Sequence, residues 1–136
     1  MIHIIMGLRG TGKTKKLIDS INTTLQSATG DVTCIEYGKK LTYDISHKAR
    51  LVDSKEYGIN SAEMLKGFLS GLHAGNFDIT HVYIDNLYKT IGHDLSAAED
   101  FVVWADKFAS TNDMDITISI SEDPALVSER MRSYLL

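Results

Sequence analysis

Residues 1–18 read MIHIIMGLRGTGKTKKLI, and this stretch decides the fold. The mostly apolar run from Ile2 to Met6 is typical of a strand that is buried on both faces. It leads directly into GLRGTGKT at residues 7–14. Apolar residues at helical spacing then predict a helix from Lys13 to about Gln26. A strand, a glycine-rich turn and a helix in direct succession indicate the first unit of an α/β fold.

The glycine-rich turn has the spacing of a phosphate-binding loop, G-x-x-x-x-G-K-[ST]. Glycines allow backbone conformations that aim several N–H groups at one phosphate, and the following helix adds its own unpaired N–H groups. We expect Lys13 to reach the β- and γ-phosphates and the Thr14 hydroxyl to hold Mg²⁺. The alternative is a glycine-rich turn with an accidental lysine, which leaves the flanking strand and helix unexplained. The expected binding residues are Gly7, Arg9, Gly10, Thr11, Gly12, Lys13 and Thr14.

The rest of the chain alternates between strand-like and helix-like patterns. Strands are expected over residues 32–37, 80–85 and 116–121, and helices after Asn60, after Ser96 and after Asp123-Pro124, the last running toward Leu136. Residues 50–53 fit a short strand, and residues 41–45 fit a loop or an edge hairpin. This alternation predicts a three-layer α-β-α sandwich with a mainly parallel sheet of about four or five strands. The 136 residues are expected to form a single domain, residues 1–136.

Composition and charge narrow the possible functions. The net charge of −4 argues against a general electrostatic grip on nucleic acid. No stretch has the roughly 18 consecutive apolar residues of a membrane span. A single cysteine cannot form an internal disulfide, and no signal peptide is visible, so we expect a cytoplasmic protein.

Two segments carry a family resemblance. GLRGTGKT after IHIIM resembles the P-loop NTPase superfamily, without pointing to a specific member, and HVYIDNL at residues 81–87 resembles its Walker B strand, which ends in an acid. The resemblance implies ATP and Mg²⁺ as ligands, with Thr14 and Asp85 holding the metal. Taken alone, Asp85 would fit better as a strand-terminal residue that caps a turn, and only its combination with the glycine-rich loop favours the metal-binding interpretation.

Within the superfamily, the resemblance favours the RecA- and AAA-like branch. In that branch the strand after Walker B lies between the first strand and the Walker B strand. Deoxynucleoside kinases of the thymidine kinase type fit less well, because this chain has only one cysteine for their zinc site and has Asn86 where they carry an acid.

Asn86 also stands where the branch implies a glutamate that polarises the attacking water. An asparagine orients water but accepts no proton, so we expect slow hydrolysis or a base from elsewhere. Glu36, at the end of the second strand, is a candidate base, although a solvated strand end is the simpler interpretation. Ser119 or Ser121 would sense the γ-phosphate, unless the alternation over residues 116–121 only marks a half-covered sheet face.

Partners are harder to predict than ligands. A protein partner or a second copy would complete the site, and Arg9, Arg130 and Arg132 are candidates for such a contact unless they are simply solvated. The basic stretches at residues 39–40 and 48–50 are interleaved with Asp44 and Asp53, so a nucleic-acid partner is not favoured. Tyr37, Tyr43 and Tyr88 lie near strand ends, where an aromatic ring is able to stack on a base.

These observations predict a Mg²⁺-dependent ATP-binding protein with slow or partner-stimulated ATP hydrolysis, in which Lys13, Asp85 and Asn86 act on the phosphoryl group. Adenine is preferred by analogy, because the Asn-Lys-x-Asp motif of GTPases is absent. One alternative is a small-molecule or nucleoside kinase whose acceptor is held by residues 38–60 and 86–94. The other is a non-catalytic module in which the nucleotide only switches a partner surface.

Overall fold

A computed structural model describes residues 1–136 and confirms the α/β fold. Five parallel strands form one sheet in the order β1-β5-β4-β2-β3. The strands are β1 (Ile2–Gly7), β2 (Asp31–Glu36), β3 (Arg50–Asp53), β4 (Ile79–Ile84) and β5 (Asp115–Ser121). The helices are α1 (Lys13–Ser27), α2 (Ala62–Gly75), α3 (Leu87–Ile91), α4 (Leu95–Thr111) and α5 (Glu129–Arg132), with one 3₁₀ turn, η1 (Pro124–Leu126).

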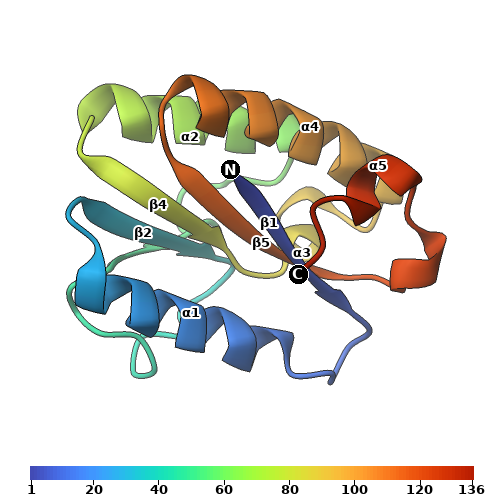
Figure 1. The fold of residues 1–136 in the computed structure, drawn as a ribbon, viewed down its shortest axis with the longest axis horizontal. Helices are drawn as coiled ribbons and strands as arrows, with labels where there is room; N and C mark the ends of the chain where they lie inside the picture. Colours follow the sequence, from blue (N-terminus) through green and yellow to red (C-terminus); the bar gives the residue numbers. More distant parts are fainter.

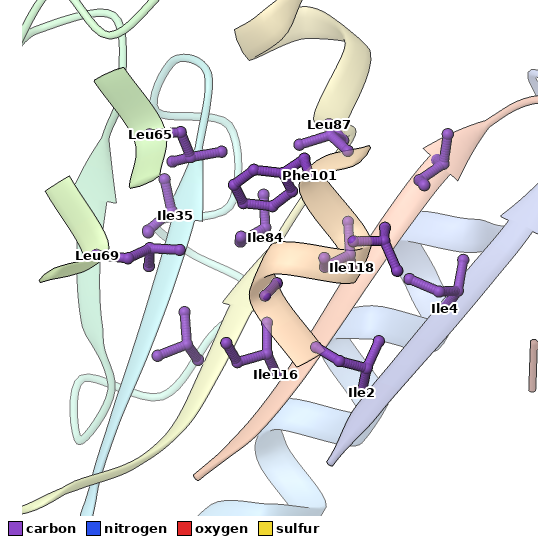
Figure 2. Packing of buried hydrophobic residues seen from close by; sticks show 14 of the residues in the cluster. Ile2, Ile4, Ile35, Leu65, Leu69, Ile84, Leu87, Phe101, Ile116 and Ile118 are labelled. Atoms are coloured by element: carbon purple, nitrogen blue, oxygen red, sulfur yellow. The ribbon is translucent and has the colours of Figure 1, made fainter. Parts of the chain in front are cut away.

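Helices cover both faces of the sheet, as Figure 1 shows, with α1 on one face and α2 and α4 on the other. The larger apolar cluster lies under α2 and α4, where Phe101 and Leu65 pack against strand residues such as Ile84 and Ile118 (Figure 2). The smaller cluster lies under α1 and includes Leu17. Each fully buried aliphatic or aromatic side chain contributes roughly 1.5–3 kcal/mol, so these two layers hold the sheet in place.

The position of β5 determines where the site lies. It pairs with β1 through Ile4 and Ile118 and with β4 through Ile84 and Ile118, so it separates these two strands. This is the order that the RecA-like resemblance implies. Thr117 and Ser119 are buried along with the isoleucines, so the alternation in β5 does not mark a half-covered face, and that interpretation was wrong. A central strand of a parallel sheet is covered on both faces whatever its polarity pattern.

Two helices differ from the sequence-based prediction. The five-residue helix α3 was not predicted, because it is too short to show an apolar periodicity. Helix α4 begins at Leu95, one residue before the predicted cap Ser96, because the Asp94 carboxylate accepts a hydrogen bond from the Ala97 amide at 3.1 Å. Aspartate is as good a cap as serine, so the sequence offered two starting points.

The C-terminal segment is not one long helix, contrary to the prediction. Asp123 caps only the 3₁₀ turn η1, and Ser128 caps the separate helix α5. The chain then turns back along the edge of the sheet, where the Ile4 amide donates to the Tyr134 carbonyl at 2.8 Å. The C-terminal residues therefore form hydrogen bonds with the open edge of β1 and do not continue the helix.

The region between β2 and α2 was predicted to contain a short strand at residues 50–53 and either a loop or an edge hairpin at residues 41–45. Residues 50–53 form the edge strand β3, whereas residues 41–45 form turns and no hairpin. Leu41, Ile45 and Ala49 are buried against the α1 face of the sheet. No helix in the structure combines the length and apolar character needed to cross a bilayer.

Candidate functional site

The turn between β1 and α1 has the backbone shape that its glycines predict. Gly10 and Gly12 have φ angles of 83° and 85°, in the left-handed region that glycine adopts without steric cost. At Gly7 the limit is space, because an added Cβ would lie 2.5 Å from the Thr11 hydroxyl oxygen. The loop is therefore tightly folded.

Helix α1 opens toward this loop without a side-chain cap. Its N-cap residue is Gly12, which has no side chain to bond the first-turn N–H groups. The first N–H groups of a helix lack partners within the helix and carry the positive end of its dipole. Lys13, Thr14 and Lys15 occupy this first turn and line the pocket described below. The helix terminus thus presents donors and positive charge to that pocket.

Lys13 folds back over the loop. Its ammonium group donates to the Leu8 carbonyl at 2.8 Å, and the residue is only 9% exposed. Burial lowers the pKa of Lys13, and the nearby Asp85 carboxylate partly offsets that effect. A partly desolvated cation of this kind gains from contact with an anion more than a solvated lysine does.

Asp85 follows β4 and is held by neighbours from two other elements. Its Oδ1 atom accepts a hydrogen bond from the Ser119 hydroxyl at 3.0 Å, and the Thr14 hydroxyl lies 3.5 Å away. Ser119 comes from the adjacent strand β5, and Thr14 from α1. The sheet order therefore brings together the two residues that were predicted to hold a metal.

Asn86 has an unusual conformation and an unpaired oxygen. Its φ angle is 49°, in the left-handed region that asparagine tolerates better than most residues. Its backbone N–H donates to the Ser119 hydroxyl at 2.7 Å. Its side-chain Oδ1 is shut off from solvent and accepts no hydrogen bond from the protein. An orphaned buried acceptor is rare in native proteins and points to a role toward water or a ligand.

A second group of residues lies beyond Asn86, on α3 and the loop that follows. Tyr88 is 8% exposed, and its hydroxyl donates to Glu122 Oε1 at 2.7 Å. Burial, and then the bond to Glu122, raises the pKa of Tyr88, so the hydroxyl stays a donor. The His93 ring stacks on the Tyr88 ring with centroids 4.3 Å apart. Lys89 follows Tyr88 on the same helix.

The glycine-rich loop at residues 7–14 and α3 line one open pocket of about 650 Å³. It gathers five basic side chains and no carboxylate among its lining residues, which are Arg9, Gly10, Gly12, Lys13, Thr14, Lys15, Asn86, Tyr88, Lys89, His93 and Ser121. In a chain of net charge −4, this concentrates positive potential in one place. Lys15, Lys89 and His93 line the pocket but were not among the predicted site residues. The only available signal for the last two was their position shortly after Asp85.

Several candidates from the sequence lie elsewhere. Glu36 is buried, not solvated, and its Oε1 accepts from the Leu41 amide at 2.9 Å. Burial raises the pKa of Glu36, and the hydrogen bond from Leu41 opposes this effect. Glu36 therefore anchors residues 38–45 and does not line the pocket. Tyr37, Tyr43, Arg130 and Arg132 do not line it either.

Thr14 and Asp85 suit a magnesium ion. Mg²⁺ takes oxygen ligands, keeps several waters, and in nucleotide sites uses one or two protein oxygens plus the phosphates. A hydroxyl and a carboxylate 3.5 Å apart match that chemistry. No group of three or more His, Cys, Asp or Glu residues that could hold a metal ion is present.

No family model matches the chain, and no curated protein sequence matches it either. The candidate site therefore stands on its own geometry and charge.

Proposed function

We propose that this protein binds a nucleoside triphosphate with Mg²⁺, ATP being the first candidate, and hydrolyses it slowly. One observation carries the proposal: the glycine loop, Lys13 and Thr14 line a single basic pocket, and Asp85, which does not itself line the pocket, lies 3.5 Å from the Thr14 hydroxyl. Neither a lone glycine loop nor a lone strand-end aspartate would support it.

The residues divide the work of phosphoryl transfer among them. Lys13 would neutralise charge on the outer phosphates, and Thr14 and Asp85 would hold a Mg²⁺ ion, which would supply further charge stabilisation to the phosphates. Ser119 fixes the rotamer of Asp85 through its 3.0 Å hydrogen bond. Asn86 lines the pocket, and a rotation of its side chain that turns the buried, unpaired Oδ1 toward the pocket would let the amide orient the attacking water. Because an amide does not take up the proton, turnover is slow unless a partner supplies a base.

The structure fits only half of the acceptor site that the kinase alternative requires. Its acceptor site required residues 38–60 and 86–94 together, and only the second segment lines the pocket. Leu41, Ile45 and Ala49 of the first segment are committed to the α1 side of the core. Hydrolysis with water as the acceptor is therefore the function that the pocket supports best.

The decisive test compares the parent protein with Lys13→Ala and with a matched control, Lys107→Ala, on the exposed surface of α4. We expect Mg-ATP to stabilise the parent by about 2.7 kcal/mol at a hundredfold excess over the dissociation constant. Lys13→Ala should weaken binding about 10- to 100-fold, through loss of a charge-assisted hydrogen bond, and Lys107→Ala should leave it unchanged.

Thermal shift and calorimetry with ATP, GTP and ADP, with and without Mg²⁺, provide the readout. No binding of any nucleotide to the parent would refute the proposal. Tight binding without phosphate release, in the parent alone and with an acceptor, would leave the switch-type module as the function. Phosphate transferred to an acceptor in preference to water would establish the kinase.

A further inference from the structure

We propose that Lys89 and His93 form a second anion-binding wall, opposite the phosphate loop, that holds the terminal phosphate of a polyphosphate tail. This inference rests on the proposed function. It adds that the protein recognises the ligand by its terminal phosphate. The pocket would then discriminate a triphosphate from a diphosphate by charge, without help from a partner protein.

The sheet order sets the distance between the two walls. The phosphate loop follows β1, α3 follows β4, and β5 lies between them. Neighbouring strands lie about 4.8 Å apart, so the two walls start roughly 10 Å from each other. Ser121, at the end of β5, lines the pocket between them. A gap of this width spans more than one phosphate group.

Contacts with neighbouring side chains hold His93 in place. Its ring stacks on the buried Tyr88 ring, and its Nε2 lies 3.8 Å from Glu122 Oε1. Gly92 has a φ angle of 96° and donates its N–H to the Tyr88 carbonyl at 2.9 Å, which folds the chain back over Tyr88. The His93 side chain is nevertheless 73% exposed, so it remains available to an anion. Preorganisation of this kind lowers the entropy cost of binding.

Lys89 is the cation on this wall with no competing carboxylate. It takes part in none of the ion pairs of the structure, whereas Lys15 on the opposite wall is paired with Asp19 at 3.0 Å. Glu122 is engaged by Tyr88 and by the Asp123 amide, so it neutralises the wall only in part. An exposed, unpaired lysine in a basic pocket favours an anionic ligand.

The lining also indicates which part of the ligand is contacted. Only one of the eleven lining residues is hydrophobic. Nucleobases bind by stacking and apolar contact, and phosphates bind by donors and charge. The pocket therefore fits the phosphate tail, and inorganic tripolyphosphate should compete with ATP for it.

The experiment measures the ratio of ATP to ADP affinity by calorimetry in the presence of Mg²⁺. We expect Lys89→Gln and His93→Asn each to reduce this ratio by about tenfold, since each removes a charge-assisted contact to the third phosphate alone. Lys89→Arg keeps the charge and should keep the ratio. Lys107→Gln, far along the exposed face of α4, is the surface control. Inorganic tripolyphosphate should displace ATP from the parent and do so less well from Lys89→Gln.

The outcomes separate this inference from the function on which it rests. If the parent binds ATP and the ratio is unchanged in both variants, the second wall is refuted and the proposed function survives. If the parent binds no nucleotide, both fail. Equal melting temperatures of the variants and the parent without ligand exclude unfolding as the cause of a lost ratio.

Discussion

The two walls of the pocket hold the same kind of charge but are built in different ways. The phosphate loop takes its shape from eight consecutive residues, GLRGTGKT, and from glycines in the left-handed region. The second wall, Lys89 and His93, is the α3 wall. It depends on contacts between distant residues, since Tyr88 behind it reaches Glu122 across 34 positions of the chain. The loop keeps its shape through local backbone geometry, and the α3 wall keeps its shape through packing and a buried hydrogen bond.

This difference suggests different tolerances to mutation. Changes in the loop act directly on the donors that would surround the phosphates in the proposed complex. Changes behind α3 act through the placement of Asn86 and His93, so their effects depend on how much of the supporting structure remains. Three substitution series test this contrast.

The largest effect is expected at Asn86, which directly precedes α3 and lines the pocket. Asn86→Glu places a carboxylate one methylene farther from the backbone at a residue that lines the pocket, and so supplies the missing general base. We expect ATP hydrolysis to rise about 100-fold, the lower end of what a positioned base contributes. The left-handed backbone at Asn86 disfavours glutamate and limits the gain. Phosphate release under saturating Mg-ATP is the measurement.

Asn86→Gln is the matched control for this prediction. It extends the side chain by the same length but accepts no proton, so hydrolysis should stay at the parent rate. An increase with glutamine as large as that with glutamate would show that length, not basicity, limits turnover. A rate with glutamate at or below the parent value would remove Asn86 from the reacting atoms.

How much was predictable from the sequence follows from the same contrast. The β1–loop–α1 unit and Asp85 could be read directly, because their signals are local runs and a fixed spacing. Ser119 or Ser121 was predicted to sense the γ-phosphate; in the structure Ser119 is bonded to Asp85 and to the Asn86 amide, and Ser121 lines the pocket. That assignment depended on which strands are neighbours, which no local pattern reveals.

Glu36 and the α3 wall show more clearly which features cannot be predicted from the sequence. Glu36 looked solvated because charged strand ends usually are, yet a returning loop buries it and hydrogen-bonds to it. Helix α3 has only five residues, too few for helical periodicity. Lys89 on this helix and His93 after it were therefore not predicted as site residues. The pairing of Tyr88 with Glu122 requires β5 beside β4, a tertiary fact.

The next effect concerns Lys13 on the loop wall and depends on pH. Burial lowers the pKa of Lys13 in the free protein, and a bound polyphosphate should raise it again. Binding therefore takes up a proton once the pH exceeds the free pKa, and affinity falls by up to about tenfold per pH unit until the bound pKa is reached. Calorimetry from about pH 8 to about pH 11 covers this range, which lies around the ordinary lysine pKa. Lys13→Arg keeps its charge throughout, so an equally steep fall in that variant would assign the proton to another group.

The smallest effect is expected from Tyr88→Phe, which separates the two supports of the α3 wall. Phenylalanine loses the 2.7 Å bond to Glu122 but keeps the ring on which His93 stacks. We expect the free energy of unfolding to fall by about 1–3 kcal/mol, because a buried carboxylate oxygen loses its donor, while ATP affinity changes less than about threefold. Tyr88→Leu also removes the stack and should lower the ATP-to-ADP ratio as His93→Asn does. Chemical denaturation and calorimetry on both variants supply the comparison. If Tyr88→Phe alone abolishes the ratio, then Glu122, and not the aromatic stack, positions His93, and the α3 wall is held by charge.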